Sequence, residues 1–164
     1  MSDPYREAVQ QHRVQLDEIR KSIEATFPRG RPLDPASITA TPKDRDEGQR
    51  IYQDFKGRDW PSVPVELLDR NSPEFLTTKG LHYYLPAYLV AGLTFENDRI
   101  RNRAVAVPQP GLSGDTDLLR ERMAVFSAAE RSVVRRYLSV IKAAYGFEFD
   151  DEAWPQLRGE SLWA

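Results

Sequence analysis

The chain has 164 residues, the size of one domain with a hydrophobic core of its own. It contains no cysteine, which excludes disulfides, zinc–thiolate sites and thiol nucleophiles and favours a reducing, cytoplasmic location. The net charge is −2, from 23 Lys and Arg against 25 Asp and Glu, and because the two signs are interspersed we expect no nucleic-acid partner.

The N-terminal part predicts one amphipathic helix followed by a connector. Asp3 is a capping residue, Pro4 fits the first helical position, and apolar residues follow at helical spacing as far as Phe27. His12 lies on the same apolar stripe, and because no second ligand stands four residues later we expect a partly buried, hydrogen-bonded imidazole there. Residues 29–42 are rich in Pro, Gly, Ser and Thr, which predicts a loop or an extended connector.

Two shorter helices are predicted before the middle of the chain. Residues 43–56 carry one apolar face, and Gly57 is the expected end of this helix. Trp60 stands before a proline and is expected to pack on the core. A short helix through Leu68 follows, and Asn71 ends it.

The most apolar and aromatic stretch of the chain is residues 75–95, which contain one formal charge, Lys79. Numbered as a helix, both faces of this stretch are apolar or aromatic, so we expect it to form the buried centre of the fold. Pro86 costs roughly 3 kcal/mol in a regular helix interior, which predicts either one kinked helix or a new helix that begins at Pro86. The apolar part, residues 81–95, is too short and too polar to span a bilayer, and we expect no membrane insertion.

Candidates for a ligand pocket lie beside this proline: His82, Tyr83, Tyr84 and Tyr88. A histidine and three phenols at a helix break could form a polar pocket in which His82 acts as an acid or base. The competing interpretation is that the tyrosines fill the core and place their hydroxyls at its edge. Because no second titratable partner for the imidazole appears within this stretch, the structural interpretation is favoured.

The phrase GLHYYLPAY, from Gly80 to Tyr88, resembles a signature of the form G-[FL]-x-[FY]-Y-L-P-A-Y found in an uncharacterised family of small bacterial proteins, a domain of unknown function. The spacing of Trp60, Pro61 and Pro64 before it is similar to that family as well. The resemblance covers roughly the C-terminal two thirds of the chain. It implies helical character and a bacterial origin, and it implies no chemistry, because the family has no assigned catalytic residues.

Arg99, Arg101 and Arg103 alternate with Ile100 and Asn102. Alternation of this kind predicts a short strand near residues 99–107 with the three arginines on one side. Such a row could bind a phosphate or the carboxylates of a partner, so the arginines are partner-binding candidates. A solvated edge, or salt bridges to the acidic C-terminus, is the alternative.

The last third of the chain predicts two helices and a tail. The first helix is capped near Thr116 and runs to Met123. The second opens with a capping box from Ser127 to Glu130 and ends near Tyr145.

The aromatic and acidic tail supplies two more partner-binding candidates, Trp154 and Trp163. No P-loop is present, residues 111–114 do not complete a G-x-S-x-G motif, and neither histidine stands in a zinc-binding pattern. We therefore expect no metal ion and no cofactor.

Together these patterns predict an all-α fold: a single domain over residues 1–164, built as a compact bundle of five or six helices around a central buried helix interrupted at Pro86. Residues 1–42 would supply the N-terminal helix and the connector, and residues 43–164 the helical core. For function, the balanced charge, the missing catalytic motifs and the aromatic tail favour a cytoplasmic, non-catalytic protein-binding module that neutralises or regulates a partner protein. A small enzyme or ligand-binding protein with a His/Tyr pocket around Pro86 stays open as the alternative. The sequence indicates neither the identity of the partner nor the oligomeric state.

Overall fold

The computed structural model describes residues 3–40, 47–107 and 116–146. Over these residues the chain forms α-helices and short 3₁₀ helices and contains no strand, so the all-α prediction is confirmed. In chain order the elements are α1 Pro4–Gln11, α2 Arg13–Thr26, η1 Pro35–Ser37, α3 Glu47–Phe55, η2 Trp60–Ser62, α4 Val65–Arg70, η3 Pro73–Phe75, α5 Thr78–Gly92, α6 Asp98–Ala106, α7 Thr116–Met123 and α8 Ala128–Tyr145.

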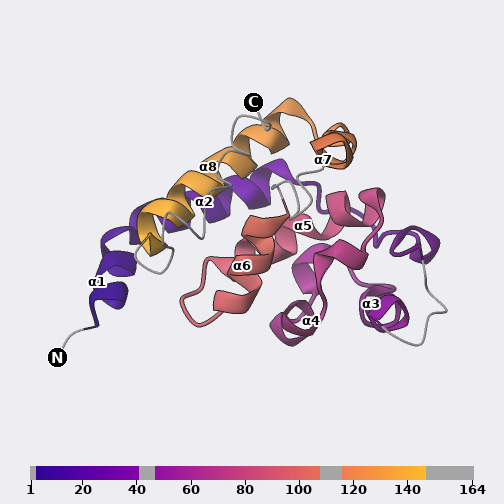
Figure 1. Ribbon diagram of the computed structural model, residues 1–164, viewed down its shortest axis with the longest axis horizontal. Helices are drawn as coiled ribbons and strands as arrows, with labels where there is room; N and C mark the ends of the chain where they lie inside the picture. The colour runs from indigo at the N-terminus through magenta and orange to yellow at the C-terminus, as the bar shows by residue number, and fades with distance from the viewer. Residues whose placement is uncertain (1–2, 41–46, 108–115, 147–164) are drawn as a thin grey trace.

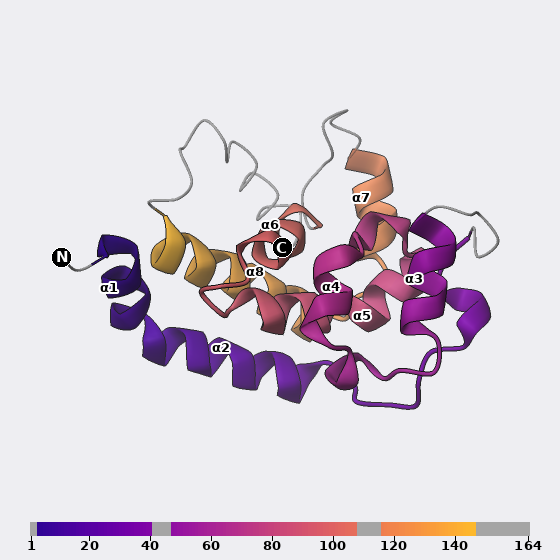
Figure 2. The ribbon, with the colours of Figure 1, turned by 90° about the horizontal axis from the view of Figure 1, so that it is seen from below.

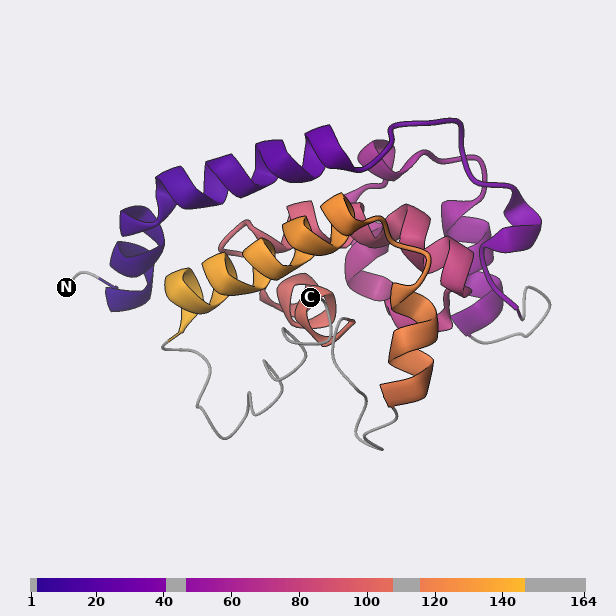
Figure 3. The same ribbon diagram turned by 90° about the horizontal axis from the view of Figure 1, so that it is seen from above.

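Helix α5 lies between two groups of helices. On one side α2 and α8 run antiparallel and side by side, and α1 packs against α8 (Figures 1 and 3). On the other side lie α3 and α4, while α6 folds back against α5 (Figures 1 and 2). The buried residues of these helices form one hydrophobic cluster, to which the N-terminal helix α2 and the core helices both contribute.

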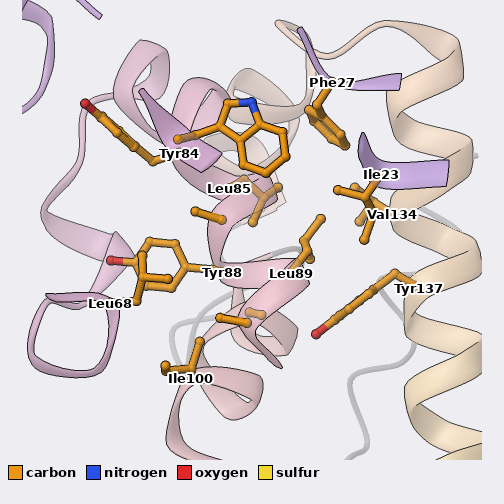
Figure 4. Packing of buried hydrophobic residues seen from close by; sticks show 14 of the residues in the cluster. Ile23, Phe27, Leu68, Tyr84, Leu85, Tyr88, Leu89, Ile100, Val134 and Tyr137 are labelled. Carbon is orange, nitrogen blue, oxygen red and sulfur yellow. The ribbon is translucent and has the colours of Figure 1, made fainter. Parts of the chain in front are cut away.

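The buried side chains of α5 contact both groups. Leu85 and Leu89 face Ile23 of α2 and Val134 of α8, whereas the ring of Tyr88 lies against Leu68 of α4 (Figure 4). A helix enclosed on both sides in this way needs no polar face, which explains the apolar composition of this stretch.

Helix α5 begins at a side-chain cap and continues through its proline. The hydroxyl oxygen of Thr77 accepts a hydrogen bond from the Gly80 amide at 2.9 Å. Pro86 lies buried inside the helix, which continues past the proline and ends at Gly92. Packing on both sides of α5 offsets the hydrogen bond that the proline ring removes.

The connector after α2 packs against the start of α5. Ile38 is fully buried, and its carbonyl accepts a hydrogen bond from the Thr77 amide at 3.0 Å. A Cβ at Gly80 would lie 2.6 Å from that same carbonyl oxygen, so only glycine permits this approach. The described part of the connector therefore belongs to the same core as the helices.

The N-terminal segment forms two helices where one was predicted. His12 has φ −98° and ψ 11°, which ends α1, and its Nδ1 lies 2.8 Å from the carbonyl oxygen of Ala8. The imidazole is half-buried and hydrogen-bonded, as predicted. No Gly or Pro stands between α1 and α2, so the sequence did not predict that the helix ends at His12.

The strand predicted near residues 99–107 is wrong, because residues 99–106 belong to α6 and Val107 is its C-terminal cap. Ile100, Ala104 and Val105 are buried at helical spacing and form the apolar stripe of this helix. The arginines recur every second residue by coincidence, whereas the buried apolar residues recur at the spacing of a helix.

The other predicted helices match the structure where it describes them, and residues 43–46 of the helix predicted over residues 43–56 lie outside the described residues. Trp60 is buried and donates its indole N–H to the carbonyl of Pro28 at 2.9 Å, so it anchors the chain as expected. Gly57 follows α3 with φ 72°, and the capping box at Ser127 is present at the start of α8. No helix among the described residues is sufficiently long and apolar to cross a membrane.

Candidate functional site

The tyrosines of α5 donate their hydroxyl groups to backbone carbonyls of neighbouring segments. Tyr84 lies within hydrogen-bond distance of the carbonyls of Phe55 and Arg58, at 3.0 and 2.9 Å, at the end of α3. Tyr88 donates to the carbonyl of Asn71 at 2.6 Å, at the end of α4. Both rings are fully buried, and this burial raises the pKa of each phenol.

Tyr83 forms a hydrogen bond to a third segment, because its hydroxyl donates to the carbonyl of Arg31 in the connector at 3.0 Å. The three hydroxyl groups thus hold three different segments to α5. Two of these segments follow the ends of helices, where the last carbonyls have no partner within the helix. The arrangement corresponds to the interpretation in which tyrosines fill the core and satisfy polar groups at its edge.

A polar network connects α3 and α4 beside Tyr88. The side chain of Asn71, which is buried, donates to Asp54 at 2.7 Å and to the carbonyl of Leu67 at 2.8 Å. Asp54 also forms an ion pair with Arg70. Burial alone would raise the pKa of Asp54, but the hydrogen bonds from Arg70 and Asn71 outweigh it and hold the pKa below its ordinary value.

His82 faces the other way, toward the start of α8. Its Nε2 lies 2.9 Å from Oε2 of Glu130, and its ring meets the ring of Phe126 edge-on at 4.8 Å between centroids. The same carboxylate oxygen accepts the amide of Ser127 at 2.8 Å as part of the capping box. Glu130 is buried, with 7% of its side chain exposed, whereas 31% of the His82 side chain is exposed.

This pair has two chemical interpretations. A partly exposed imidazole oriented by a buried carboxylate is the arrangement of a general base. It is equally a structural link, because Glu130 closes the cap of α8 and His82 joins that cap to α5. The pair was not predicted from the sequence, because its members stand 48 residues apart.

The three arginines of α6 have separate roles. Arg101 is fully buried, its guanidinium lies 3.7 Å from the ring centroid of Tyr145, and it donates to the carbonyl of Thr94 at 3.1 Å. Arg103 donates to the carbonyl of Leu68 at 3.1 Å, and Arg99 lies 3.3 Å from a carboxylate oxygen of Asp69. The predicted row of three arginines on one side of a strand is therefore wrong, because α6 is a helix and Arg101 is buried.

Tyr137 of α8 is buried beside Arg101. A Cβ at Gly92 would lie 2.6 Å from its hydroxyl oxygen, and burial raises the pKa of the phenol. Among the described residues this hydroxyl has no hydrogen-bond partner. It is the exception to the pattern of the other buried tyrosines in this core.

The exposed face of α8 carries a group of cations that sequence reasoning did not single out. Arg135, Arg136 and Lys142 are all exposed, and none forms an ion pair or hydrogen bond within the described part of the chain. The adjacent arginines, and a lysine seven positions after the first of them, were visible in the sequence once the buried side of this helix was assigned.

Trp154 and Trp163 lie outside the described residues. Within those residues, no group of three or more His, Asp or Glu side chains could hold a metal ion. No protein-family model, curated protein or solved structure matches the chain. The family resemblance at residues 80–88 therefore stays a prediction, and function has to be argued from the residues themselves.

Proposed function

We propose that this chain is a non-catalytic protein-binding module of the cytoplasm that neutralises or regulates a partner protein. One observation carries the proposal: the hydroxyl groups of α5 and the guanidinium groups of α6 are bonded to the protein's own backbone and carboxylates. An enzyme of this size would use such groups on its substrate. In this chain these groups stabilise the fold, so the function is assigned to other groups on the surface.

Two further features support the proposal. The charge of the chain is nearly balanced, with 23 basic and 25 acidic residues, which disfavours general binding to polyanions. The aromatic tail adds Trp154 and Trp163, a residue type that is enriched at protein interfaces.

Affinity purification from the native host tests the proposal. The tagged chain and a tag-only control would be recovered at a series of salt concentrations, and co-purifying proteins quantified by mass spectrometry. We expect one protein to be enriched in near-stoichiometric amount and lost as salt rises. If no protein is enriched at any salt concentration, the proposal fails.

A general base formed by His82 and Glu130 is the second candidate function, favoured by the 2.9 Å contact and the partial exposure of the imidazole. A His82→Gln variant separates it from the first. A catalytic role requires that turnover of a substrate disappear while the fold is kept. A binding module keeps its partner in this variant.

A further inference from the structure

The outward side of α8 has an ordered arrangement of residues. Arg135 and Lys142 stand seven residues apart, about 10 Å along the helix and on nearly the same side of it. Arg136 lies about 100° further round the helix. The small exposed residues Ser132 and Ser139 lie between Arg136 and the other two cations. The opposite side of the helix is buried against α2 and the core. The three cations therefore project from one continuous exposed face.

No carboxylate of α8 balances these cations. Its one acidic residue, Glu130, is buried and is bonded to His82 and to the Ser127 amide. On α2, by contrast, Lys21 lies 2.9 Å from Asp17 of the same helix. The face of α8 is thus a concentration of like charge that the described part of the fold leaves uncompensated.

We propose that this face of α8 binds an acidic segment of the partner protein, an inference that rests on the function proposed above. Carboxylates two helical turns apart in the partner would match the separation of Arg135 and Lys142, and a further carboxylate would meet Arg136. The serines between the cations let a partner backbone approach α8 closely.

The neighbouring charges favour a protein over a nucleic acid. Helix α2 lies alongside α8 and exposes charges of both signs, with Asp17 and Glu18 standing among Arg13, Arg20 and Lys21. A nucleic acid has a charge on every phosphate, so a strand extending beyond α8 would meet these two carboxylates as well as the cations of α2. A protein segment places its carboxylates only where cations face them.

Binding of a fluorescent polyglutamate peptide to the full chain tests the surface. The test variant is Arg135→Glu/Arg136→Glu/Lys142→Glu, and the matched control is Arg13→Glu/Arg20→Glu/Lys21→Glu, which reverses the same amount of charge on α2. Both sets of side chains are exposed, so both variants should keep the fold, which circular dichroism checks. We expect the α8 variant to bind the peptide at least about tenfold more weakly than wild type, and the dissociation constant of the control to stay within about twofold of wild type. Binding by the wild type should weaken as the salt concentration rises.

Three results would overturn the inference. The first is an equal loss in both variants, which would mean that net charge alone attracts the peptide. The second is no binding of polyglutamate by the wild type at low salt. The third is tighter binding of a DNA duplex than of polyglutamate, lost in the α8 variant, which would assign the face to nucleic acid.

Co-purification with the same two variants separates this inference from the proposed function. A partner that is recovered with wild type and control but not with the α8 variant supports both. A partner retained by the α8 variant refutes this surface and leaves the binding module standing. No partner for any of the three proteins refutes the proposed function itself.

Discussion

Replacing Tyr137 with Phe should stabilise the protein, although it removes a polar group from the core. The hydroxyl of Tyr137 is fully buried and has no hydrogen-bond partner among the described residues. A buried polar group without a partner costs about 1–3 kcal/mol in unfolding free energy. The variant removes that cost and keeps the ring, so we expect a gain of about 1 kcal/mol, which corresponds to an increase of roughly 2–4 °C in Tm for a chain of this size.

Tyr88→Phe is the matched control, because it removes the same atom from an equally buried ring. The hydroxyl of Tyr88 donates to the carbonyl of Asn71 at 2.6 Å, and its loss leaves that carbonyl without this donor. We expect a decrease of about 1–2 kcal/mol in unfolding free energy. Urea denaturation followed by circular dichroism measures both variants, and an equal decrease in the two would show that the Tyr137 hydroxyl is stabilised by its surroundings as the Tyr88 hydroxyl is.

A second substitution tests the same contact from the other side. A Cβ at Gly92 would lie 2.6 Å from the Tyr137 hydroxyl oxygen and 3.0 Å from Cα of Arg101. Overpacking of this kind costs about 1–3 kcal/mol, so Gly92→Ala should destabilise the protein. Part of that cost should disappear in the Tyr137→Phe background, because the first obstacle is then absent, and additive effects would contradict the geometry.

Three further predictions follow from other contacts. Because the pKa of Asp54 is lowered in the folded protein, its stabilising effect is complete above the ordinary pKa of 3.8 and is lost as the pH falls through the folded-state pKa. Asp54→Asn should therefore reduce the dependence of the unfolding free energy on pH below 3.8. An unchanged pH dependence would assign the acid sensitivity to other groups. Gly80→Ala should lower Tm, because the new Cβ would lie 2.6 Å from a backbone carbonyl, whereas Gly30→Ala meets nothing within 4 Å and should not. His82→Ala should lower the unfolding free energy by about 1–3 kcal/mol, because it removes a donor from the buried carboxylate of Glu130, and an unchanged urea midpoint would show that the contact contributes nothing to stability.

The helix ends were the part of the fold most readily predicted from sequence. Asp3 caps α1 and Ser127 caps α8 where expected, because a capping side chain bonds within its own first turn. The burial of α5 also followed from local composition, since both faces of a helix over residues 78–92 are apolar or aromatic. Such signals need no knowledge of what packs against the helix.

The features that the sequence did not predict depend on distant contacts. The partner of His82 comes from α8, and nothing in the local sequence indicates which helix packs beside it. Arg101 was predicted to share one side of a strand with Arg99 and Arg103 because the three alternate with other residues, yet here carbonyls at the end of α5 and the ring of Tyr145 surround its charge. The cations of α8 could be identified in the sequence, but only the structure shows that Glu130, the acidic residue of this helix, is buried and does not face them.

One co-purification experiment with two variants separates the role of the α5 polar groups from that of the α8 cations. The central claim is that the polar groups around α5 serve the fold and that the exposed cations of α8 serve binding. The His82→Gln variant should recover the partner as wild type does, while Arg135→Glu/Arg136→Glu/Lys142→Glu should lose it. Loss of the partner with His82→Gln, together with its retention by the α8 variant, would contradict the account.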